Sequence, residues 1–235
     1  MSKFSQNCCP EIRAFNYLIA IFFKISYNIY DHEKLFKKNT KMVFLTAASN
    51  VIGKKLPLKE IGELCKDNNI LFGVDAAQAA GIIKIDMKKL NINFLCFAPH
   101  KGFYAPTGLG VLITEKYLNN ILISGGTGVN SLEPVQPEFM PERIESGTQN
   151  VPAIFGLKSG IEFVNSIGQQ SIEKHEISLV RYAYQKLEKL GSELYSACPD
   201  SKGFVPVLSF NLRGKSAVCD KDCNSASEIA DAGRK

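Results

Sequence analysis

The chain has 235 residues, which is enough to bury a sizeable core as one domain or one domain and a half. Its hydrophobic content of 45% and charged content of 22% are ordinary for a soluble globular protein. The net charge of +5 is mild and the lysines are dispersed along the sequence, so we expect no nucleic-acid partner.

The apolar run over residues 17–23 is the most membrane-like stretch of the chain, but Lys24 ends it after seven residues. A membrane-spanning helix needs about 20 apolar residues, so a buried helix or strand is the better interpretation. We expect no membrane association.

Seven cysteines are scattered along the sequence. An odd number at irregular spacing is typical of free thiols in a reducing cytoplasm, where we expect the protein to reside. Cys219 and Cys223 are close in sequence, but none of the three histidines is nearby to complete a metal site. We therefore expect no bound metal.

The hydrophobic pattern predicts strands that alternate with helices. Strands are expected over residues 41–46, 70–74, 93–98, 110–114 and 205–212, and helices over residues 57–68, 152–165 and 171–191. The first helix connects two strands, which should therefore run parallel with a right-handed crossover. The pattern indicates an α/β protein with a mostly parallel sheet and covering helices, followed by a second unit from about residue 170. Between them lies the glycine- and proline-rich stretch 121–150, and a loop of that length is usually functional or part of an interface.

Three polar residues come after predicted strands: Asn50, Asp75 and Lys101. In open α/β sheets ligands bind at the carboxyl ends of the strands, so these residues are expected to share a site. A carboxylate such as Asp75 can keep the pyridine nitrogen of pyridoxal phosphate protonated, and Gln78 is close enough in sequence to turn toward the same ring. Lys101 can form a Schiff base with the cofactor aldehyde.

Five strings of residues, taken in order, resemble the class V aminotransferase family and its cysteine desulfurase-like branch. They are Ser49–Gly53, Val74–Gly81, His100–Gly110, Gly125–Gly128 and Arg143–Asn150. The resemblance covers about residues 30–213 and implies a fold-type-I pyridoxal-phosphate-dependent enzyme that forms a homodimer. It places a partial large domain over residues 30–168, and a linking helix with the start of a smaller C-terminal α+β domain over residues 169–235.

The resemblance also implies a role for each candidate site residue. Lys101 would carry the Schiff base, and Asp75 would pair with the pyridine nitrogen. Gln78 would form a hydrogen bond with the ring oxygen, and Asn50 would lie beside that oxygen or the substrate. His100 would lie by the phosphate or support the lysine loop, and Thr148 would reach the phosphate of the partner subunit's cofactor. The implied substrate is L-cysteine or a related amino acid, with a sulfur-acceptor protein as a further partner. Simpler alternatives remain for three of these residues: Asn50 as a turn residue, Asp75 as a helix N-cap, and Thr148 as a cap for the helix near Pro152.

The chain also departs from the family pattern. Residues 1–29 contain no matching phosphate loop or ring-stacking residue, and Ala98 stands where typical desulfurases have serine. Residues 213–235 do not match the cysteine loop of desulfurases, and the surroundings of Cys219 do not resemble it. We therefore expect a chain truncated at both ends. The alternative to an active enzyme is an inactive remnant or a fragment that binds another protein.

Overall fold

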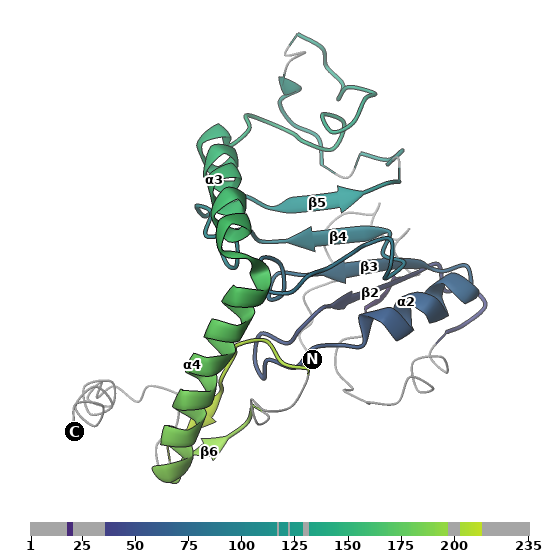
Figure 1. Cartoon of the computed structure of the whole chain (residues 1–235). Helices are drawn as coiled ribbons and strands as arrows, with labels where there is room; N and C mark the ends of the chain where they lie inside the picture. Colours follow the sequence, from purple (N-terminus) through teal and green to yellow (C-terminus); the bar gives the residue numbers. More distant parts are fainter. Residues whose placement is uncertain are drawn as a thin grey trace, which may run out of the picture.

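The computed structural model describes residues 18–20, 36–116, 118–121, 123–128, 132–196 and 203–212. A five-stranded sheet with the order β1-β2-β3-β4-β5 forms its centre (Figure 1). The strands are β1 (Leu18–Ala20), β2 (Met42–Thr46), β3 (Leu71–Asp75), β4 (Phe94–Phe97) and β5 (Val111–Thr114). Strands β1 to β4 run parallel and β5 is antiparallel to β4, so the expectation of a mostly parallel α/β sheet is confirmed.

Helix α2 (Leu58–Asp67) connects β2 to β3 within two residues of the predicted bounds. Pro57 stands at its N-cap, where the missing backbone N–H interrupts no helical hydrogen bond. Asn69 comes after the helix with φ 55°, a left-handed conformation that asparagine tolerates better than most residues, and turns the chain into β3. Strands β2 and β3 then pair in parallel along their full length.

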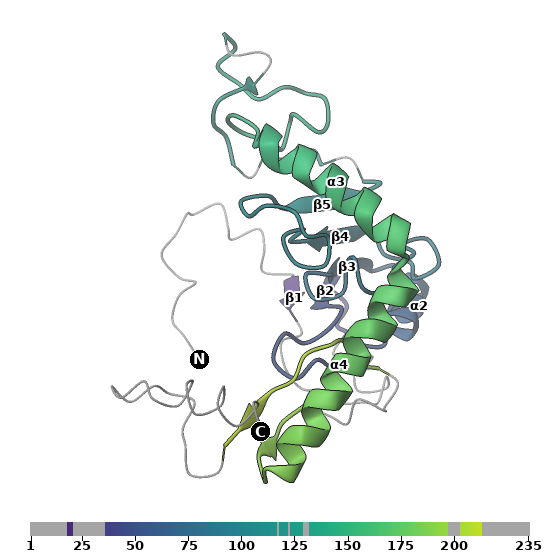
Figure 2. The same cartoon turned by 60° about the vertical axis from the view of Figure 1, so that its left-hand side comes forward.

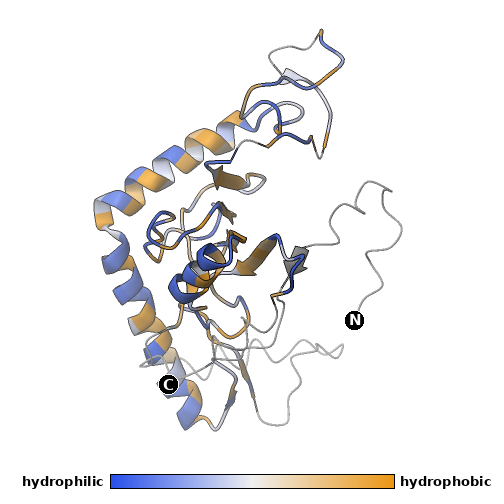
Figure 3. Ribbon diagram, turned by 90° about the vertical axis from the view of Figure 1, so that its right-hand side faces the viewer, coloured by the Kyte–Doolittle hydropathy of each residue, from blue (hydrophilic) through white to orange (hydrophobic). Residues whose placement is uncertain are grey.

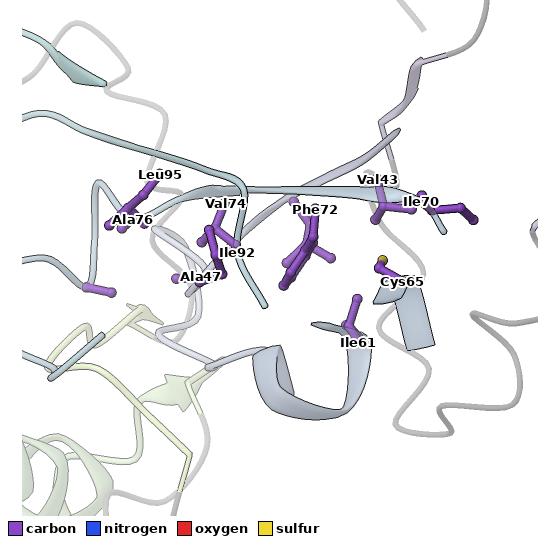
Figure 4. Packing of buried hydrophobic residues seen from close by; sticks show 12 residues of the cluster. Val43, Ala47, Ile61, Cys65, Ile70, Phe72, Val74, Ala76, Ile92 and Leu95 are labelled. Atoms are coloured by element: carbon purple, nitrogen blue, oxygen red, sulfur yellow. The ribbon is translucent and has the colours of Figure 1, made fainter. Parts of the chain in front are cut away.

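One face of the sheet carries the hydrophobic core, which α2 covers (Figure 4). Side chains alternate between the two faces of a strand, and Phe72 and Val74 of β3 point into this core. Complete burial of a side chain such as Phe72 stabilises the fold by about 1.5–3 kcal/mol. The same alternation places Gly73 and Asp75 on the opposite face, where the ring of Phe44 lies directly over Gly73.

Two helices come after the sheet as a bent pair, α3 (Val151–Ile167) and α4 (Gln169–Lys189) (Figure 2). Both predicted helices are therefore present. Asn150 caps α3, since its side-chain oxygen accepts a hydrogen bond from the Ala153 N–H at 3.2 Å. Gly168 joins the helices with φ 85°, a conformation that glycine adopts without strain. No helix in the described ranges is long and apolar enough to cross a membrane.

The strand predicted over residues 205–212 is wrong in extent. Only β7 (Phe210–Asn211) pairs as a strand, with the short β6 (Glu193–Leu194). The backbone before β7 pairs with a different segment, because the Val205 N–H donates a hydrogen bond to the backbone oxygen of Gly53 at 2.7 Å. The alternating apolar pattern instead reflects close packing of residues 205–207 against Gly53.

Candidate active site

The carboxyl ends of β2, β3 and β4 are held together by hydrogen bonds just beyond the strands. The Ala47 N–H donates to the Asp75 oxygen and the Ala76 N–H to the Cys96 oxygen, both at 2.7 Å. Asn50 lies exposed in the turn after β2, where the Ser49 hydroxyl oxygen accepts hydrogen bonds from the N–H groups of Val51 and Ile52. The turn interpretation of Asn50 is thus correct, and its side chain remains available to a ligand at this edge.

Asp75 is half-buried at the last position of β3. Its Oδ1 accepts a hydrogen bond from the Ala77 N–H at 2.9 Å. The helix N-cap interpretation of Asp75 is wrong, because residues 77–82 form successive turns rather than a helix. Gln78 is half-buried within these turns, and its side-chain amide bonds no other residue in the described part of the chain. One carboxylate and one amide are therefore displayed from a single short segment.

Lys101 lies in a tight turn after β4, where its backbone oxygen accepts a hydrogen bond from the Tyr104 N–H at 3.1 Å. Its side chain is exposed, and among the described residues its amine has no hydrogen-bond or ion-pair partner. His100 precedes it, also exposed. An amine without an ion pair suits a lysine reserved for covalent chemistry.

Two glycines bring the acid-bearing and amine-bearing loops into direct contact. A Cβ atom added to Gly102 would overlap the backbone oxygen of Ala80, and one added to Gly81 would overlap the oxygen of Gly102. Gly81 also has φ 86°, which disfavours any side chain. Only glycine at both positions allows the loop with Asp75 and Gln78 to lie against the loop with Lys101.

Helix α3 supports the lysine loop from behind through two more glycines. A Cβ on Gly160 would overlap the backbone oxygen of Phe103, and a Cβ on Gly156 would overlap the ring of Pro106. The lysine loop is therefore packed between the β3 loop and α3.

Cys96 is a neighbour of this site that the sequence pattern did not identify. It pairs with Asp75 across β3 and β4, so the two side chains share a face of the sheet. Burial, together with the nearby Asp75 carboxylate, raises the pKa of the Cys96 thiol, which keeps it protonated near neutral pH. The strand register needed to detect this pair is not visible in either segment alone.

A second group of candidate residues surrounds a cleft of about 410 Å³ in the segment 118–149. The cleft is lined by Gly125, Gly126, Thr127, Gly128, Glu133, Pro134, Gly147 and Thr148. The Gly147 N–H donates to the Gly126 oxygen at 2.7 Å, which joins the two glycine-containing stretches. The capping role considered for Thr148 is wrong, because Asn150 caps α3, and Thr148 instead lines this cleft.

The structure keeps these two groups apart. Asn50, Asp75 and Lys101 lie at the carboxyl edge of β2 to β4, whereas the segment 118–149 extends beyond β5, away from β2 and β3 (Figures 1 and 2). Thr148 is therefore not part of the same constellation within one chain. Cys219 and residues 1–17 lie outside the described residues.

The groups at the sheet edge fit pyridoxal phosphate. Asp75 offers a carboxylate for a protonated ring nitrogen, and Gln78 and Lys101 offer an amide and an amine that bond no other side chain or backbone group among the described residues. The cleft in segment 118–149 offers backbone and hydroxyl groups of the kind that bind an anion.

Comparison with known proteins finds a family and several relatives that the chain resembles. Residues 20–230 match the family described as Aminotransferase class-V. A probable cysteine desulfurase from Pyrococcus abyssi is 36% identical over 181 residues, which cover 74% of this chain and 45% of the relative. A cysteine desulfurase from Escherichia coli is 33% identical over 184 residues, covering 76% of this chain and 44% of the relative. The chain thus spans about half the length of the curated relatives it matches.

Solved structures give the same result. The apo structure of a cysteine desulfurase from Thermococcus onnurineus superposes with a TM-score of 0.71 and 33% identity, covering 88% of this chain and 51% of the other. The architecture is that of the fold-type-I enzymes, with a mostly parallel sheet and covering helices. The match over most of the sequence and the shared fold lead to one assignment: the chain belongs to the class V aminotransferase family.

Proposed function

We propose that this chain carries the cofactor-binding part of a pyridoxal-phosphate-dependent enzyme that acts on L-cysteine or a related amino acid. The observation that carries the proposal is the contact between Gly81 and Gly102, which places the acid and the amine on adjoining loops. When bound, pyridoxal phosphate supplies an electron sink for the carbanion chemistry of amino acids. The protein residues bind and orient it and move protons.

The residues at the sheet edge divide these tasks. Asp75 holds a positive charge at the ring nitrogen, and its fixed Oδ1 bond to Ala77 sets the orientation of the carboxylate. Gln78 would donate a hydrogen bond to the ring oxygen, Asn50 would lie beside that oxygen or the substrate, and His100 would support the lysine loop or lie by the phosphate. Lys101 would hold the cofactor through its aldehyde and would carry a proton to and from the substrate.

The phosphate end of the site is assigned to a second copy of the chain. Thr148 lines a cleft that lies away from Asp75 and Lys101 of the same chain. Segment 118–149 exposes large apolar side chains, among them Val135 at 68%. Hydrophobic residues also recur along α3 (Figure 3), where Phe155 is exposed. Such a surface is typical of a protein–protein contact, so we propose a homodimer in which Thr148 of each chain completes the other's site.

The test is to purify the chain with pyridoxal phosphate, record its visible spectrum, reduce it with borohydride and map the labelled peptide. We expect an absorption band and a label on Lys101, both lost in Lys101→Ala. Lys84→Ala is the matched control, because Lys84 is also exposed but lies in the connection between β3 and β4. Formation of alanine from cysteine, with sulfide set free by an added thiol reductant, then separates a desulfurase from a lyase, which forms pyruvate, and from a transaminase, which frees no sulfide.

A label spread over many lysines, or no band, would contradict the proposal. That result would favour the alternative of a chain without catalysis that binds another polypeptide through its exposed apolar surface.

A further inference from the structure

The turn that carries Asn50 is held from outside by a distant part of the chain, the segment 203–209. The Val205 N–H donates a hydrogen bond to the backbone oxygen of Gly53 at 2.7 Å, and Val205 is only 2% exposed. The Ser209 hydroxyl donates to the backbone oxygen of the residue that follows Asn50. Because these bonds join segments far apart in the sequence, the position of the turn depends on where segment 203–209 lies.

Lys55 fastens the end of the same turn to two further groups. Its backbone N–H donates to the Gly203 oxygen at 2.7 Å, and its amine forms an ion pair with the Glu173 carboxylate of α4, also at 2.7 Å. The two side chains of this pair are only 25% and 34% exposed, whereas Lys158 and Glu162 of α3 pair at 3.9 Å in a far more exposed position. The turn is therefore anchored to α4 as well as to segment 203–209.

The close approach of segment 203–209 to the turn depends on a glycine. Gly53 has φ 71°, a left-handed conformation that glycine adopts without strain. A Cβ atom added to it would lie 2.9 Å from the backbone oxygens of both Val205 and Val207. Backbone atoms cannot rotate away as a flexible side chain can, so a larger residue at Gly53 would push the two segments apart.

We infer that Gly53 is a positioning residue: it lets segment 203–209 pack against the turn and so holds Asn50 beside the ring oxygen of the cofactor; the inference rests on the proposed function. Gly53 has no side chain to offer a ligand and acts through Asn50. The loops that carry Asp75 and Lys101 are joined by a separate pair of glycines. Displacement of segment 203–209 should therefore remove only what Asn50 contributes.

The test is a double-mutant cycle on the full chain, with the affinity for pyridoxal phosphate measured by absorbance titration. We expect Gly53→Ala to lower the affinity about tenfold, as loss of one hydrogen bond to a charged group would. In an Asn50→Ala background the same change should cause no further loss, because the residue through which Gly53 acts is gone. Gly191→Ala is the matched control, since Gly191 has φ 70° but no atom within 4 Å of an added Cβ. It should leave the affinity unchanged.

A milder variant covers the case in which Gly53→Ala does not fold. Glu173→Gln removes the ion pair to the turn at a partly exposed position of α4. We expect it to lower the affinity about threefold in the wild-type background and not at all in Asn50→Ala. Glu162→Gln, which breaks the exposed pair with Lys158 on α3, should have no effect in either background.

A second measurement needs no cofactor. The Lys55 N–H is bonded to the Gly203 oxygen, so its hydrogen exchange should be about tenfold faster in Gly53→Ala and unchanged in Gly191→Ala. An equal loss of affinity in both backgrounds, no loss in either, or unchanged exchange at Lys55 would overturn the inference. If the wild-type chain does not bind pyridoxal phosphate, the proposed function fails, and the exchange rate alone decides whether Gly53 lets segment 203–209 hold the turn.

Discussion

The loops at the carboxyl edge of the sheet and the segment 118–149 are built in different ways. The edge loops lie above a hydrophobic core and contact each other closely at Gly81 and Gly102. The segment 118–149 is held by hydrogen bonds within itself, among them the bonds from the Arg143 guanidinium to the oxygens of Leu118, Pro137 and Asn119. The edge loops are therefore held in place by the rest of the fold. Segment 118–149 is shaped by its own hydrogen bonds, and no described part of the chain covers its surface.

This difference indicates which part of the proposed site each region would supply. Under the proposed function, Asp75 and Lys101 would bind the same cofactor, and both come from the region that the core holds in place. The cleft in segment 118–149 keeps its own geometry through local bonds, as a site that completes the partner chain's site in the proposed homodimer would need to do. The comparison predicts that changes in the two regions have separable consequences.

The largest effect should come from Gly102→Ala. The added Cβ would overlap the Ala80 oxygen, a backbone atom that cannot move without shifting the loop that carries Gln78. Overpacking of this kind costs about 1–3 kcal/mol, so we expect the affinity for pyridoxal phosphate to fall by up to about 100-fold, measured by absorbance titration.

Gly110→Ala is the matched control for Gly102→Ala. No atom lies within 4 Å of a Cβ added at Gly110, at the start of β5, so its cofactor affinity should stay at the wild-type value. Normal cofactor binding by Gly102→Ala would show that the edge loops are not held together by this contact.

The core beneath the edge loops should respond to alkaline pH through Cys65. Burial raises the pKa of its thiol from 9.0 to about 11, so the folded state favours the neutral form. This contribution to stability is fully present below pH 9 and is lost as the pH rises toward 11, by about 2–3 kcal/mol.

The measurement is urea unfolding of wild type and Cys65→Ala between pH 8 and pH 11. The stability difference between the two proteins should shrink as the pH rises, because only the wild type must ionise a buried thiol. A difference that stays constant would mean that the Cys65 thiol ionises as readily in the folded chain as in the unfolded one.

Much of the sheet edge could be predicted from the sequence, for a physical reason. Short apolar runs and one amphipathic helix define β2, α2 and β3, and a parallel pair brings the residues just past each strand to the same edge. The sequence therefore predicts that Asp75 and Lys101 lie at this edge. Their roles toward a cofactor remain predictions.

The remaining features depend on contacts between distant segments, which local patterns do not encode. Nothing near Gly81 indicates that it meets Gly102, and nothing near Gln136 indicates that it bonds Gly125. Apolar and polar residues do alternate over residues 205–212, but the backbone at Val205 forms its hydrogen bond with the loop at Gly53 and not with a long strand. Thr148 and Asn150 are both good capping residues, and only the structure shows which one caps α3.

A smaller effect should come from Val135→Asp, which tests whether segment 118–149 faces a second copy. A charge placed in an apolar contact should weaken the dimer about tenfold, because its desolvation is not compensated. Sedimentation velocity over a range of concentrations measures this change. Leu190→Asp is the control, since Leu190 is similarly exposed, at 65%, but lies at the far end of α4 (Figure 1). If both variants weakened the dimer equally, or if neither did, the dimer contact would lie elsewhere. Thr148 could then not complete the partner's site.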